Sequence, residues 1–92
     1  MKILKSPQIS DNIVNYSFNN DVITATLNDE VDTFDFSSMP NDSITTEIET
    51  TLAMSVIEKA ERDASGVLKV VLYTPISEDA TELQKFPVWE DV

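Results

Sequence analysis

The stretch "NIVNYSFNNDVITATLNDEVDTFDF", residues 12–36, alternates apolar and polar side chains over most of its length. A period of two places every second side chain on the same face of a strand, so this alternation predicts three β-strands. Their apolar faces consist of Val14, Tyr16 and Phe18, of Ile23, Ala25 and Leu27, and of Phe34 and Phe36. The strands are separated by "NND" and "NDE", whose residue types tolerate left-handed backbone in tight turns. We therefore expect a three-stranded antiparallel meander.

The next segment, residues 44–64, fits two periods. With a period of four it forms one helical stripe, which a carboxyl cap at Gly66 would end. That stripe consists of Ile44, Ile48, Leu52, Val56, Ala60 and Ala64. With a period of two, several of the same side chains share one face of a strand. Four threonines in the segment favour a pleated strand, but the two periods leave both interpretations open.

The segment from residue 62 to residue 73 indicates a β-hairpin. "RDASG" at 62–66 has the composition of a turn, and "VLKVVLY" at 67–73 is typical of a buried strand. A hairpin over residues 55–73 would place Gly66 at a turn position with positive φ. We therefore expect a mainly β fold built from an antiparallel meander and hairpins. The alternative is an α+β fold with one long helix at about residues 44–64.

The carboxyl-terminal part predicts a short helix followed by two aromatic side chains. Ser77 can cap this helix and Pro87 ends it, so we expect it over about residues 78–85. Phe86 and Trp89 follow. An indole usually packs onto the body of a small protein, and we expect Trp89 to do so. The alternative is that Phe86 and Trp89 bind a partner protein, because tryptophan is enriched at interfaces.

The composition excludes most familiar active sites. The 92 residues fit a single globular domain, residues 1–92. They include no cysteine and no histidine, which removes thiolate chemistry, imidazole bases and the usual zinc ligands. A single glycine cannot form a glycine-rich phosphate loop, and the acidic groups lack the spacing of an EF-hand. We therefore expect no enzyme, no catalytic residues, no cofactor and no metal site.

The net charge narrows the range of partners. Seventeen acidic and six basic residues give a formal charge of −11, which repels phosphate backbones and anionic lipids and favours a basic protein. No stretch approaches the ~20 apolar residues of a membrane span, and the amino terminus lacks the apolar core of a signal peptide. We therefore expect a cytoplasmic protein with a protein partner, no nucleic acid and no membrane. An alternative role for the charge is a DNA mimic that inhibits a host nucleic-acid-binding protein.

Three segments carry a resemblance to a known group of proteins: "YSFNNDVITATLNDEVDTFDFSSMP", "VIEKAERDASGVLKVVLYTPI" and the closing "FPVWEDV". With them the chain resembles small proteins encoded among the tail and lysis genes of phages and prophages of Gram-positive bacteria. The resemblance implies an accessory or small structural protein that binds another protein, such as a phage tail component, in the cytoplasm of the bacterial host. It leaves open the oligomeric state and incorporation into the virion.

Overall fold

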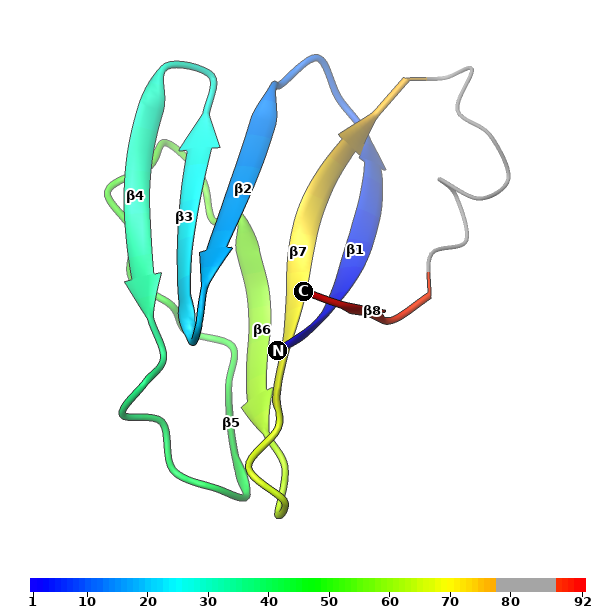
Figure 1. Ribbon diagram of the computed structural model, residues 1–92. Helices are drawn as coiled ribbons and strands as arrows, with labels where there is room; N and C mark the ends of the chain where they lie inside the picture. Colours follow the sequence, from blue (N-terminus) through cyan, green and yellow to red (C-terminus); the bar gives the residue numbers. More distant parts are fainter. Residues whose placement is uncertain (78–87) are drawn as a thin grey trace.

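The computed structural model describes residues 1–77 and 88–92, which form strands and connecting loops (Figure 1). The eight strands are β1 (Lys2–Ile9), β2 (Val14–Asn19), β3 (Val22–Leu27), β4 (Glu30–Asp35), β5 (Ser43–Thr45), β6 (Ile57–Arg62), β7 (Leu68–Ile76) and β8 (Glu90–Asp91). The predicted mainly β fold is confirmed, and the described residues contain no helix. The short helix predicted at about residues 78–85 lies outside the described residues.

The predicted meander is confirmed as a three-stranded sheet of order β2-β3-β4. Both pairs are antiparallel, with Val14 opposite Leu27 and Ile23 opposite Phe34. The turns are tight because Asn20 and Asn28 each adopt a φ of 54°, a left-handed backbone that asparagine tolerates. The alternating face on β3 and β4 turns into the core, as the period of two predicts.

The five-stranded sheet has the order β5-β6-β7-β1-β8. Its β1 and β7 run parallel over their whole length, from Lys2 beside Lys69 to Ile9 beside Ile76. Every other pair of neighbouring strands in the described residues is antiparallel. Strand β1 is not predicted from the sequence, because "KILKSPQI" alternates weakly and contains a proline.

The alternative of one long helix at about residues 44–64 is wrong. Residues 43–45 form β5, residues 46–56 follow an irregular path, and β6 begins at Ile57. The carboxylate of Asp32 on β4 accepts hydrogen bonds from the Thr50 hydroxyl at 2.8 Å and the Thr51 amide at 3.0 Å. Threonine disfavours helix, and here Thr50 and Thr51 bond to a neighbouring strand, while the Thr50 hydroxyl also accepts a 3.1 Å bond from the Leu52 amide.

The predicted hairpin over residues 55–73 is confirmed by antiparallel pairing of β6 with β7. Its turn contains Gly66 at a φ of 89°, where a side chain would be strained. The Asp63 carboxylate accepts hydrogen bonds from the amides of Ser65 at 2.9 Å and Val67 at 3.0 Å, the pattern expected of an aspartate-initiated turn.

The core lies between the two sheets and draws on both. The largest fully buried side chains are Ile23, Val56, Leu68, Val70 and Leu72. Burial of each such side chain stabilises the fold by roughly 1.5–3 kcal/mol before the loss of conformational entropy. Ile3 is also buried, so β1 contributes to the same core.

Candidate functional site

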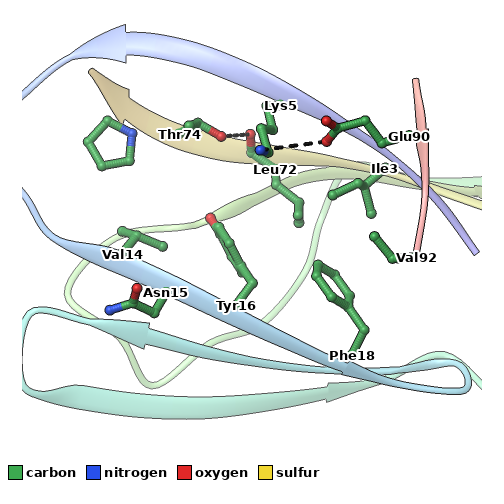
Figure 2. Close-up of a pocket in the computed structure, with 11 residues that line it drawn as sticks. Ile3, Lys5, Val14, Asn15, Tyr16, Phe18, Leu72, Thr74, Glu90 and Val92 are labelled. Atoms are coloured by element: carbon green, nitrogen blue, oxygen red, sulfur yellow. Dashed lines mark hydrogen bonds and ion pairs between the residues drawn. The ribbon is translucent and has the colours of Figure 1, made fainter. Parts of the chain in front are cut away.

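A groove of about 380 Å³ lies between β2 and the β1–β8 edge of the five-stranded sheet (Figure 2). Its volume falls within the ~300–1,000 Å³ typical of ligand pockets. Residues of β2 form one wall, and residues of β1, β7 and β8 form the other. The apolar lining consists of Ile3, Val14, Phe18, Leu72, Pro75 and Val92. Side chains from both ends of the chain therefore meet in one apolar hollow.

The groove exists because the two sheets are offset. The Tyr16 hydroxyl on β2 donates a hydrogen bond to the carbonyl oxygen of Tyr73 on β7 at 2.5 Å, so β2 lies against β7. Beyond β7, the five-stranded sheet continues with β1 and β8. The three-stranded sheet ends at β2 (Figure 1). The inner faces of β1 and β8 thus extend past the other sheet.

Tyr16 joins the two sheets through its hydroxyl group. Burial raises the pKa of its hydroxyl, and the negative charge of Glu58 raises it further. The phenol therefore keeps its proton at neutral pH. That proton serves the bond to the Tyr73 carbonyl, with the Val56 carbonyl oxygen also near, at 3.3 Å.

Several other polar groups of the groove already have partners. Lys5 Nζ lies 3.6 Å from Glu90 Oε2, which ties β1 to β8. The Thr74 hydroxyl donates to the Leu72 carbonyl oxygen at 3.2 Å (Figure 2). Groups held in this way are poorly placed to attack a substrate or to move its proton. The side chains of Lys5 and Thr74 are therefore held by other groups of the groove wall.

On the side of β2 that faces away from β3, backbone groups have no partner among the described residues. Antiparallel pairs alternate between bonded and non-bonded positions, and a 2.7 Å bond from the Asn28 amide to the Ile13 carbonyl sets the phase. Asn15, Ser17 and Asn19 therefore bond to β3. The amides and carbonyls of Val14, Tyr16 and Phe18 point the other way, and no described residue bonds to them. We call these six groups the free edge of β2.

The other outermost strands carry the features by which proteins discourage strand pairing: charge and short length. β4 contains three acids, β5 has three residues, and β8 consists of Glu90 and Asp91. β2 has six residues, "VNYSFN", without a charge, a proline or a glycine. Among the described edge strands, β2 is the one left suitable for pairing with a further strand.

Trp89, one of the two predicted partner-binding residues, stands apart from this groove. Trp89 directly precedes β8 and is 44% exposed, outside both the buried core and the groove lining. Phe86 lies outside the described residues. The tail is joined to the body through β8, which pairs with β1, and through a 3.1 Å bond from the Val92 amide to the Met1 carbonyl.

Several acidic side chains serve turns and loops. Hydrogen bonds from the Thr51 amide and the Thr50 hydroxyl lower the pKa of Asp32. Bonds from the amides of Val67 and Ser65 lower that of Asp63, with a contribution from nearby Lys69. Within residues 1–77 and 88–92, no group of three or more acids lies close enough together to hold a metal ion.

Comparison with protein-family models, curated proteins and solved structures finds no match for this chain. In the part of the chain that the structure describes, no helix is long and apolar enough to cross a membrane.

One wall of the groove follows a pattern that the sequence shows. Alternation predicts Val14, Tyr16 and Phe18 as the apolar face of a strand, and this face lines the groove. Pairing of β1 with β7 brings in the opposite wall, and no local pattern predicts that pairing. One signal was available. Residues 14–27, which cover β2 and β3, contain no charged residue except Asp21, although the whole chain has a charge of −11.

Proposed function

We propose that this protein acts by binding another protein through the groove beside β2. The observation that supports this most directly is the free edge of β2 bordering an apolar hollow of about 380 Å³. Open strand edges and exposed apolar grooves are the surfaces by which small β domains recognise partners. The resemblance to phage and prophage proteins favours an accessory or structural role with a partner from the tail module.

Binding fits the groove better than catalysis does. The chain has no histidine or cysteine. Two of the polar groups beside the groove, Lys5 and the Tyr16 hydroxyl, are engaged with Glu90 and with Tyr73. A serine or threonine nucleophile would need a free base at hydrogen-bond distance. We therefore propose that the protein is not an enzyme.

The alternative of a DNA mimic requires acids arranged in rows on one face. β2 and β3 contain no charged residue, so two of the three strands in one sheet supply no acid to such a row. The charge of −11 therefore favours attraction of a basic protein over imitation of a DNA phosphate backbone on this face.

Site-specific photocrosslinking tests the proposed surface. Asn15 is exposed on the solvent face of β2 at the rim of the groove, so a photoreactive p-benzoylphenylalanine at this position should crosslink a partner in lysate of the bacterium that encodes the chain. Val31, 58% exposed on β4, gives the matched control position. We expect one protein to crosslink at position 15 and not at position 31, as read by mass spectrometry.

Equal labelling at both positions would contradict the groove as the binding surface. Crosslinking of a nucleic-acid-binding protein that added DNA displaces would instead favour the mimic. Circular dichroism of both variants, matched to the parent spectrum, shows that each has folded.

A further inference from the structure

We infer that the partner contributes an extended segment, which pairs with the free edge of β2 and becomes the fourth strand of the three-stranded sheet. This rests on the proposed function and specifies the shape and chemistry of what binds. The groove is the space in which the shorter sheet lacks a strand opposite β1 and β8.

The backbone geometry of β2 supports pairing with a further strand. The free edge offers the amides and carbonyls of Val14, Tyr16 and Phe18, which recur at every second residue as a strand ladder requires. A strand paired there would lie about 4.8 Å from β2. It would thus run above β1 and β8, whose residues form the far wall of the groove.

The lining sets the pattern of side chains in the bound segment. Every second side chain of the added strand would point into the groove, toward Ile3, Leu72 and Val92, so these positions should be apolar. The others would continue the solvent face of β2, which carries Asn15 and Ser17. The segment therefore alternates apolar side chains with polar ones.

The charge of the groove and of the whole chain favours basic over acidic residues at the polar positions of the bound segment. Lys5 is the one base in the described lining, and Glu90 already neutralises it at 3.6 Å. The described lining thus holds no unpaired cation for an acidic segment. A protein of charge −11 attracts a cationic segment and repels an anionic one. The polar positions of the bound strand should therefore be lysine, arginine, serine or threonine.

A second copy of this chain does not fit the same edge. Two antiparallel β2 strands would be related by a two-fold axis perpendicular to the sheet. Because β1 and β8 extend past β2, that axis would place these strands of both copies in the same volume. A segment without a second sheet beneath it has no such clash.

A helix in the groove fits less well than a strand. The backbone groups of a helix interior bond to one another, so a helix would cover the free edge of β2 without pairing with it. Buried amides and carbonyls without partners are costly. An extended segment satisfies the edge and fills the groove together.

A displayed peptide library tests the inference. Its eight-residue members carry valine, isoleucine, leucine or phenylalanine at alternate positions and lysine, arginine, serine or threonine at the others. The best peptide selected on the intact protein is then synthesised and titrated, and amide hydrogen exchange is followed by NMR. We expect Val14, Tyr16 and Phe18 to gain protection, whereas Asn15, Ser17 and Asn19 are protected already by β3.

Two controls separate backbone pairing from simple contact. The same peptide with N-methyl groups on the amides that face β2 should bind about tenfold more weakly, because it loses the ladder bonds. Thr74→Lys places a cation in the groove wall and should lower affinity by about tenfold, whereas Thr33→Lys on exposed β4 should leave it unchanged.

Other outcomes overturn the inference. Binding in the groove without protection of the three alternate amides, or equal binding of the N-methylated peptide, would mean that side chains alone are recognised, and the proposed function would stand. Crosslinking of a partner at position 15 with no peptide selected from the library would rule out strand addition in the same way. Failure of both experiments would remove the proposed function as well.

Discussion

The guanidinium of Arg62 on β6 donates from Nη2 to Asp21 Oδ2 at 3.0 Å, across the space between the two sheets. The same nitrogen donates to the Phe36 carbonyl at 2.8 Å, and Nη1 donates to the Gly66 carbonyl at 2.9 Å. Arg62 therefore connects one sheet to the β2–β3 turn and to the end of β4. The side chain is 10% exposed, and a buried cation needs such partners.

Replacing Arg62 with methionine should lower the free energy of unfolding by about 2–4 kcal/mol, because Asp21 and two carbonyls lose their donor while much of the side-chain volume remains. Urea denaturation at neutral pH measures the change. Lys59→Met on the same strand is the control, and it should shift stability by no more than ~0.5 kcal/mol. Equal midpoints for the two variants would show that Arg62 does not hold the sheets together.

Tyr16 should make stability depend on pH at the alkaline end. Its folded pKa is raised by burial, whereas the unfolded tyrosine ionises near pH ~10. The folded state then holds a proton that the unfolded state releases, so stability is lost as pH rises above this value. Tyr16→Phe should cost ~1 kcal/mol at neutral pH by removing the bond to Tyr73, and its melting temperature should fall less steeply at alkaline pH. Parallel melting curves for the two proteins would contradict this.

Asp32 should make the stability of the fold depend on pH at the acidic end. Hydrogen bonds from Thr51 and Thr50 lower its folded pKa, so its contribution is present above the pKa of the unfolded aspartate and is lost as pH falls through the folded value. Asp32→Asn should melt below the parent at neutral pH. The difference in melting temperature between the two proteins should disappear in acid, where both side chains are neutral. Thermal melts over this range provide the measurement, and a gap that stays constant would exclude the charged form as its source.

The carboxyl-terminal strand should matter more for stability than the indole beside it. Deletion of residues 90–92 removes the pairing of β8 with β1 and the Lys5–Glu90 ion pair. Trp89 is 44% exposed and outside the core, so Trp89→Ala should lower the midpoint in urea less than the deletion does. A larger effect of Trp89→Ala would show that the indole anchors the tail, as the sequence analysis expects.

Local patterns predict the parts of this fold that local interactions create. The meander follows from alternation over residues 12–36, and the β6–β7 hairpin follows from turn residues at 63–66. Residues 46–56 resist prediction because their path is set by Asp32 and by burial of Leu52 and Val56. The bonds to Asp32 leave no periodic trace in the sequence, and the spacing of four between Leu52 and Val56 fits a helix that does not form.

The groove could not be predicted from local patterns, because its walls meet only through distant pairing. Ile3 and Leu72 come to lie on one wall when β1 joins β7, and Val92 is added to that wall when β8 joins β1. The free edge of β2 depends on where the other sheet extends. An uncharged strand is visible in the sequence, but its position at the end of a sheet is not.

The parallel pairing of β1 with β7 orders the events of folding. The meander and the β6–β7 hairpin join neighbours in sequence and can form early, whereas β1 must wait for a strand made much later. During synthesis, Lys2–Ile9 leaves the ribosome well before β7 and stays without this partner until β7 emerges. Contacts formed after the folding barrier govern how fast a protein unfolds more than how fast it folds. Shortening buried Ile3 should therefore speed unfolding and leave the refolding rate nearly unchanged, which would make β1 the strand that controls the lifetime of the native state.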